Sequence, residues 1–277
     1  MQIITSISEI RIILKSHNSI GFVPTMGALH KGHLSLVQKA KTQNETVVVS
    51  IFVNPTQFNN KTDLDKYPRN LSQDVDFLQS VGVDYIFAPT TNEMYPDEHI
   101  ITYNAGYLDT IMEGATRSGH FSGVVQIVAK LFNVVKPTRA YFGQKDLQQL
   151  ILIRRMTKEL CFDITIITCE IIREPSGLAM SSRNRRLSES EKEVAIHLSK
   201  ILFECEKSVS SGVSVKKTLE QAKNVISKNN QIKLEYLAVA DAEYLSPVQE
   251  PSKQIAFCIA AFVGGVRLID NVLVELN

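Results

Sequence analysis

Short apolar runs rich in β-branched residues alternate with amphipathic segments along the first 170 residues. Five of the runs have the length and composition of buried strands: 20–23, 47–53, 85–88, 140–142 and 164–169. Four segments between them repeat apolar residues at steps of three and four, as helices do: 34–40, 71–80, 123–135 and 147–160. This alternation predicts a Rossmann-like, doubly wound α/β fold built on a parallel sheet.

The pattern changes after residue 169, where a segment containing Pro and Gly leads into a long polar loop. We therefore expect two domains, a Rossmann-like domain over residues 1–172 and a smaller α+β domain over residues 173–277. Ser188 and Glu191 have the spacing of a capping box and predict the start of a helix. A second helix and three strands should follow, at 215–226, 234–240, 255–262 and 266–272, with a turn at 263–265.

The composition excludes several classes of function. With 30 basic and 29 acidic residues the formal net charge is +1, which gives no overall attraction for nucleic acid or for an anionic membrane. The longest apolar run, 255–263, is far shorter than the roughly 20 residues of a membrane helix. The first eleven residues lack the basic start and apolar core of a secretory signal. We expect a cytoplasmic protein that binds neither nucleic acid nor membranes.

The four cysteines have no C-x-x-C spacing, which is typical of reduced thiols in a cytosolic protein. Cys169 and Cys258 lie in apolar runs and are expected in the core. An exposed and reactive Cys205 stays open as an alternative.

The segment PTMGALHKGH, residues 24–33, joins the first predicted strand to the first predicted helix. Free amide groups at a helix N-terminus attract phosphate oxygens, and His30 and His33 add directed donors there. Gly32 leaves room for close approach to the backbone. Two alternatives remain: the pair is only solvated surface, or it shares a metal ion, for which no third ligand lies nearby in sequence. Chemistry at a nucleotide phosphate is the leading hypothesis.

Two further turns also follow predicted strands, at 54–58 and at 143–146, and in a doubly wound sheet ligands bind at such strand ends. The amides of the first turn would orient a small polar substrate. In the second, Lys145 would reach a phosphate, and Asp146 would bind a ribose hydroxyl or hydrated magnesium. The alternative is an ordinary loop in which Asp146 caps the next helix.

A loop at 180–186, with the sequence MSSRNRR, gathers two hydroxyls and three guanidinium groups. Arginine matches phosphate oxygens in pairs, so Ser181, Ser182 and Arg183 are candidates for a second phosphate site. The other two arginines are expected to be solvated. Neither G-x-G-x-x-G nor G-x-x-x-x-G-K-[ST] occurs, which removes the usual signatures of nicotinamide dehydrogenases and P-loop phosphotransferases.

Taken together, these motifs resemble the pantothenate synthetase (pantoate:β-alanine ligase) family of the class I aminoacyl-tRNA-synthetase-like nucleotidyltransferases. The resemblance spans most of the chain and rests on PTMGALHKGH, SIFVNPTQF, DLDKYPRN, RSGHFSGV, YFGQKDLQQL and REPSGLAMSSRNRRLS. One departure is Gln144, where the family usually has Glu.

The resemblance implies an ATP-dependent ligase that makes pantothenate from pantoate and β-alanine through pantoyl adenylate, in the biosynthesis of vitamin B5 and coenzyme A. It implies Mg²⁺ and a homodimer as well. The resemblance implies catalytic roles for His33, as the main catalytic imidazole, and for His30, Lys145, Ser181, Ser182 and Arg183. ATP contacts are implied for those residues and for Met26, Gly27, Ala28, Leu29, Lys31, Gly32, Gly143, Gln144, Asp146, Ile172 and Met180. Pantoate contacts are implied for Gln57 and Gln149, with Arg117 and His120 in support.

Two rival functions use the same features. A related adenylyl- or cytidylyltransferase would join two phosphates instead of forming an amide. A nucleotide sensor would bind ATP without turnover.

Overall fold

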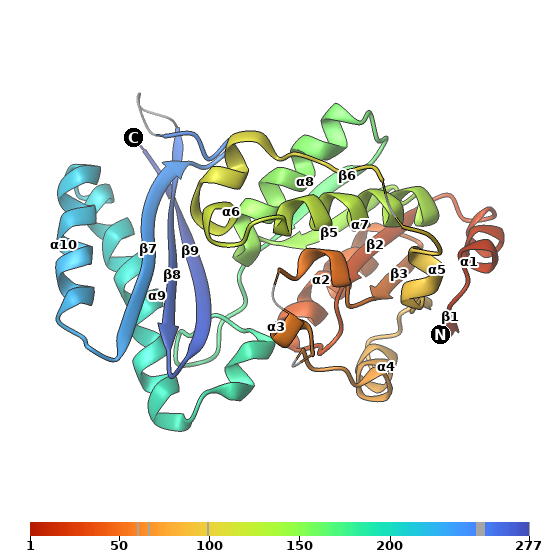
Figure 1. Cartoon of the computed structure of the whole chain (residues 1–277), viewed down its shortest axis with the longest axis horizontal. Helices are drawn as coiled ribbons and strands as arrows, with labels where there is room; N and C mark the ends of the chain where they lie inside the picture. The colour runs from red at the N-terminus through yellow and green to blue at the C-terminus, as the bar shows by residue number, and fades with distance from the viewer. Residues whose placement is uncertain (60, 66, 99, 248–252, 277) are drawn as a thin grey trace. The chain divides into compact units, whose positions relative to one another are not determined.

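The computed structural model describes residues 1–59, 61–65, 67–98, 100–247 and 253–276. Its internal contacts divide the chain into two units (Figure 1). The first unit comprises residues 1–143 and 148–170, and the second comprises residues 144–147 and 171–277. None of the helices in the described ranges has the length and hydropathy that a membrane crossing requires.

A six-stranded parallel sheet forms the centre of the first unit, which confirms the predicted doubly wound fold. Its strands are β1 (Gln2–Ile4), β2 (Ile20–Thr25), β3 (Thr46–Ile51), β4 (Tyr85–Phe87), β5 (Arg139–Gly143) and β6 (Thr165–Cys169). The short edge strand β1 was not predicted, because three residues are too few to display a period.

The strand order is β1-β4-β3-β2-β5-β6, so the chain first builds outward from β2 on one side and then returns to its other side with β5. Gly21 and Phe22 of β2 pair with Arg139 and Ala140 of β5. The carboxyl ends of these two neighbouring strands therefore mark the topological switch point, where such sheets bind their ligands.

Helices cover both faces of this sheet. Tyr141 of β5 lies in one core cluster with Val37, while its neighbour Phe142 contacts Phe132, with ring centroids 6.4 Å apart. Because successive strand residues point to opposite faces, the helices that carry Val37 and Phe132 must lie on opposite sides. The helices are α1 (Ile7–Leu14), α2 (Lys31–Gln43), α3 (Lys61–Asp65), α4 (Leu71–Gln79), α5 (Thr91–Met94), α6 (Met112–Thr116), α7 (His120–Val135) and α8 (Leu147–Glu159), with 3₁₀ turns η1 (Pro55–Gln57) and η2 (Gly106–Thr110).

The second unit is a three-stranded antiparallel sheet with two helices packed against it (Figure 1). Its elements are η3 (Gln144–Asp146), η4 (Ser182–Arg186), α9 (Glu189–Ser210), α10 (Val215–Ser227), β7 (Ile232–Asp241), β8 (Gln254–Val263) and β9 (Val266–Glu275). The predicted capping box is present, since the Ser188 side chain accepts from the Glu191 amide and the Glu191 carboxylate accepts from the Ser188 amide. Apolar residues of α9 and β8, such as Leu202 and Phe257, form its core.

The predicted boundary at 172/173 lies close to the division after residue 170. The sequence did not indicate that residues 144–147 group with the second unit. The physical reason is a set of hydrogen bonds from Asn271 of β9 to the main chain of Gln144 and Lys145.

Cys169, Cys205 and Cys258 are buried and Cys161 is exposed. The alternative of an exposed Cys205 is therefore wrong, because its position on α9 faces the core. Burial raises the pKa of the Cys205 thiol to about 11 and that of Cys169 to about 11, so the reactive thiolate is disfavoured at both positions.

Candidate active site

The two histidines of the first turn cap the helix that follows them. The Nδ1 atom of His30 accepts from the Gly32 amide at 3.1 Å, and that of His33 accepts from the His30 amide at 3.2 Å. A ring nitrogen that accepts carries no proton, so the neutral imidazoles hold their proton on Nε2. The ring centroids lie 4.0 Å apart. The pair is therefore more than solvated surface: the turn fixes both tautomers beside the N-terminus of α2.

A buried carboxylate from another helix holds the backbone of this turn. Asp74 of α4 is 4% exposed and accepts from the amides of Ala28 and Leu29, at 2.9 and 2.8 Å. Gly27 and Ala28 have φ of +78° and +51°, and a Cβ on Gly27 would lie 2.8 Å from an Asp74 oxygen. Sequence reasoning missed Asp74, because no local pattern reveals a partner so distant along the chain.

Asn54 organises the turn after β3. It is 1% exposed, and its Nδ2 donates to Oε1 of Gln57 at 3.2 Å and to the Gly123 carbonyl at 3.1 Å. Its Oδ1 accepts from the hydroxyls of Tyr95 at 2.8 Å and Thr56 at 3.1 Å. Burial raises the pKa of Tyr95, which keeps this hydroxyl protonated and donating. The network fixes the orientation of the Asn54 amide and, through it, that of Gln57.

The amide nitrogen of Gln57 consequently points to the sulfur of Met26, at 3.1 Å. The main-chain carbonyl of Gln57 accepts from Nδ1 of buried His120 at 2.9 Å, and Nε2 of His120 accepts from Arg117 at 3.0 Å. The structure thus brings Met26, Gln57, Arg117 and His120 together in the first unit. Both ring nitrogens of His120 form hydrogen bonds within the protein, so this histidine is placed to hold the main chain of Gln57 in position.

Gln149 of α8 is half-buried, and no hydrogen bond of its side chain is found within the described residues. Its neighbour Gln148 is buried and donates to the Leu108 and Ile111 carbonyls at 2.8 and 3.1 Å. Of the two adjacent amides, Gln148 is therefore the one that is committed to the fold.

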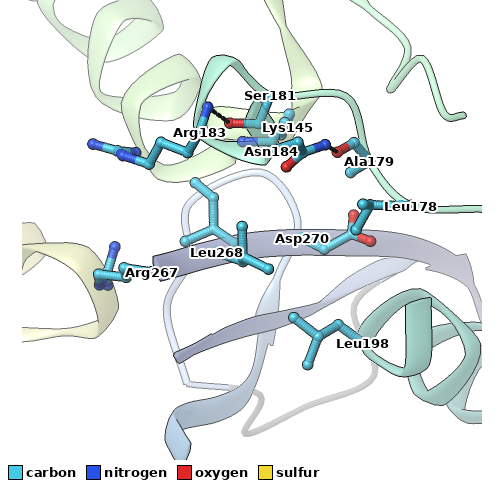
Figure 2. Close-up of a pocket in the computed structure, with 11 residues that line it drawn as sticks. Lys145, Leu178, Ala179, Ser181, Arg183, Asn184, Leu198, Arg267, Leu268 and Asp270 are labelled. Atoms are coloured by element: carbon cyan, nitrogen blue, oxygen red, sulfur yellow. Dashed lines mark hydrogen bonds between the residues drawn. The ribbon is translucent and has the colours of Figure 1, made fainter. Parts of the chain in front are cut away.

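A pocket in the second unit brings three of the predicted phosphate ligands together (Figure 2). It is lined by Lys145, Leu178, Ala179, Ser181, Arg183, Asn184, Leu198, Arg267, Leu268, Ile269 and Asp270. Ser181 accepts from the Arg183 amide at 3.2 Å, which begins η4. Asn184 donates to the Ala179 carbonyl at 3.0 Å and shapes the loop. The segment that carries Lys145 and the loop that carries Ser181 and Arg183 are distant in sequence, and they meet within one unit.

Other predicted residues lie in this loop or in the segment that carries Lys145. The Met180 amide donates to the Ile172 carbonyl at 3.0 Å, so the two predicted borders of the adenine site are neighbours. Ser182 is half-buried, while Arg185 and Arg186 are exposed, as expected. Gly143 ends β5, and Asp146 is exposed in a 3₁₀ turn that runs directly into α8.

No group of three or more His, Cys, Asp or Glu side chains able to hold a metal ion is found in the described part of the chain. The paired histidines thus lack a third ligand there.

A family model of pantoate-beta-alanine ligases matches residues 2–273. The pantothenate synthetase of Cytophaga hutchinsonii is 48% identical, over 99% of this chain and 99% of that protein. A crystal structure of pantothenate synthetase from Thermus thermophilus is 40% identical with a TM-score of 0.94, covering 98% of this chain and 99% of that one. The ligase from Francisella tularensis, complexed with beta-gamma ATP and beta-alanine, is 39% identical with a TM-score of 0.81, covering 99% and 97%. The chain belongs to the pantoate–β-alanine ligase family.

Proposed function

We propose that this ligase condenses (R)-pantoate with β-alanine to pantothenate, with conversion of ATP to AMP and pyrophosphate through pantoyl adenylate. The product is vitamin B5, a precursor of coenzyme A. The observation that carries the proposal is the histidine turn, where two fixed imidazoles and a helix N-terminus offer N–H donors at the end of β2. Family membership and the ligands of the Francisella relative support it.

In the first step, a pantoate carboxylate oxygen bonds to the α-phosphorus of ATP while the bond from that phosphorus to the bridging oxygen breaks. Pyrophosphate leaves with the electron pair. Negative charge grows on the α-phosphate oxygens, where Nε2–H of His33 and His30 would donate hydrogen bonds. Lys145 and the Ser181, Ser182 and Arg183 loop would bind the departing phosphates.

In the second step, the β-alanine amine bonds to the acyl carbon, the carbon–oxygen bond to the phosphate breaks, and AMP leaves with the electron pair while the nitrogen loses a proton to solvent. A free carboxylate resists amines because it lacks a good leaving group, and the adenylate supplies one. The order of the two steps follows from this chemistry.

Pantoate is assigned to the first unit. The Gln57 amide nitrogen, oriented by Asn54, would donate to a pantoate oxygen, and Gln149 would bind a second polar group. Arg117 and His120 would hold Gln57 in place.

ATP is proposed to contact the turn from Met26 to His33, the segment from Gly143 to Asp146, and Ile172 and Met180 beside the adenine. Magnesium would enter bound to ATP, where it offsets the charge that repels a carboxylate nucleophile.

We further propose a division of labour and an assembly. Residues 1–172 would bind ATP and pantoate, and residues 173–277 would act as a lid that carries the serine-arginine loop. The family expectation is a homodimer in the cytoplasm, and sedimentation equilibrium tests the dimer directly.

Pyrophosphate release with and without each organic substrate tests the function. The ligase should release pyrophosphate with ATP and pantoate, and should make pantothenate and AMP only when β-alanine is also present. A dinucleotide or CDP product would instead identify a nucleotidyltransferase. Tight ATP binding without any turnover would identify a sensor.

A further inference from the structure

Asn271, near the end of the chain on β9, binds the main chain of the loop that carries Lys145. Its Nδ2 donates to the carbonyl oxygens of Gln144 and Lys145, both at 3.0 Å. Asn271 is only 3% exposed, so water competes little for these bonds. One side chain thus holds two consecutive carbonyls of the loop.

The orientation of this amide is fixed from its other end. Oδ1 of Asn271 accepts from Nε2 of Gln144 at 3.1 Å, so both Nδ2 hydrogens remain directed to the loop carbonyls. The Asn271 main-chain amide in turn donates to Oδ1 of Asp270 at 2.8 Å. Both polar atoms of the Asn271 side chain are thus matched with partners, as a specifying buried network requires.

The neighbouring residue holds the other phosphate-binding stretch. Asp270 accepts two hydrogen bonds from Arg173, at 2.6 and 2.9 Å. Arg173 also donates to the Gly177 carbonyl at 3.2 Å, at the approach to the Ser181 loop. The positive charge of Arg173 also offsets the negative charge of Asp270. Asp270 lines the same pocket as Lys145 (Figure 2).

We infer that Asn271 is a positioning residue for Lys145, and that Asp270 and Asn271 of β9 form a common support for both phosphate-binding stretches. The inference rests on the proposed role of Lys145 in binding ATP phosphates. Lys145 carries a compact charge on a flexible four-carbon stem, which does not fix the position of the charge by itself. The main chain of Lys145 must therefore be held firmly if the charge is to stay near a ligand. Asn271 supplies that hold without contacting the ligand itself.

The variants Asn271→Ala and Asn271→Asp test this role. Loss of two bonds to the loop should raise KM for ATP about tenfold in the alanine variant, and more in the aspartate variant, whose carboxylate would face two carbonyl oxygens. KM for pantoate should change less than about threefold, since its proposed ligands belong to the first unit. Val272→Ala is the matched control, because Val272 is the next residue of β9, is buried, and packs in the core.

A double-mutant cycle separates positioning from a general structural role. In a Lys145→Ala background, Asn271→Ala should weaken ATP binding less than about twofold further, because its effect passes through the lysine. Full additivity would overturn the inference. If Asn271 variants do not fold, Gln144→Ala removes the 3.1 Å bond to Asn271 and should raise KM for ATP in the same direction by a smaller factor. An unchanged KM for ATP in that variant would then count against the inference. Because Gln144 also lies in the segment proposed to contact ATP, the same change is made in the Lys145→Ala background, where an undiminished effect on ATP binding would count against the inference.

Binding of a non-hydrolysable ATP analogue, measured by calorimetry, keeps the two proposals apart. Wild-type protein that binds the analogue but makes no pantothenate would refute the proposed function and leave the Asn271 effect measurable. Active wild-type protein whose Asn271→Ala variant binds the analogue equally well would refute the positioning role alone.

Discussion

Replacement of Asp74 by Asn tests whether the histidine turn depends on a buried carboxylate. Each Asp74 oxygen accepts one amide, from Ala28 at 2.9 Å and from Leu29 at 2.8 Å. An asparagine offers only one oxygen, so one amide must lose its acceptor and face the donor hydrogens of an NH2 group. Hydrogen bonds to charged groups contribute about 1.5–3 kcal/mol each, and a buried donor left unmatched costs about 1–3 kcal/mol.

Asp74→Asn should therefore lower the free energy of unfolding by about 2–4 kcal/mol, since one charge-assisted bond is lost and the other becomes neutral. It should also lower kcat for adenylate formation about tenfold or more, because His30 follows directly on the released turn. Urea unfolding measures the first quantity, and pyrophosphate release with ATP and pantoate measures the second.

Asp76→Asn is the matched control, since Asp76 lies on the same helix, is exposed, and carries the same charge. Its free energy of unfolding should stay within about 0.5 kcal/mol of wild type. If Asp74→Asn were as stable and as active as Asp76→Asn, the carboxylate would not hold the turn and the reasoning would fail.

Three further predictions follow from the site and the core. His33→Ala should slow adenylate formation by about 10²–10⁴-fold while the circular dichroism spectrum is retained, and near-normal turnover would refute its assignment as the main catalytic imidazole. Gln57→Ala and Gln149→Ala should each raise KM for pantoate more than KM for ATP, and the reverse pattern would move both residues to the nucleotide site. Burial raises the folded-state pKa of Cys169 and Cys205 from 9.0 to about 11, so the stability that these thiols contribute should be complete below about pH 9 and be lost as the pH rises to about 11. Urea unfolding of wild type and of the Cys205→Ala variant at both pH values measures the loss, and an equal loss in the two proteins would contradict the attribution to Cys205.

The sequence predicted the elements whose signal is local. Strands such as β3, with the sequence TVVVSI, are buried on both faces, so each reads as a continuous apolar run. The start of α2 was predicted too late, because its N-cap is His30 and histidine is not among the usual capping residues.

The candidate ligands were also accessible from the sequence, because strand ends and clusters of arginine and serine have local signatures. The side chains that hold these candidate ligands in place were not accessible from the sequence. Asn54, Asp74 and Asn271 act through bonds to residues far along the chain, and only folding brings those donors and acceptors together. A motif therefore indicates which groups are candidates to bind a ligand, while the network that fixes their direction requires coordinates.

The departure at residue 144 illustrates the difference. From the sequence alone, glutamine in place of the usual glutamate bears only on the phosphate site. In the structure, Nε2 of Gln144 donates to Oδ1 of Asn271, and both Nδ2 hydrogens of Asn271 are directed to main-chain carbonyls. A carboxylate at residue 144 could not donate to that oxygen, and no Asn271 hydrogen would remain to bind it. Gln144 therefore adds a third bond between this loop and β9, one that a glutamate could form only by protonation.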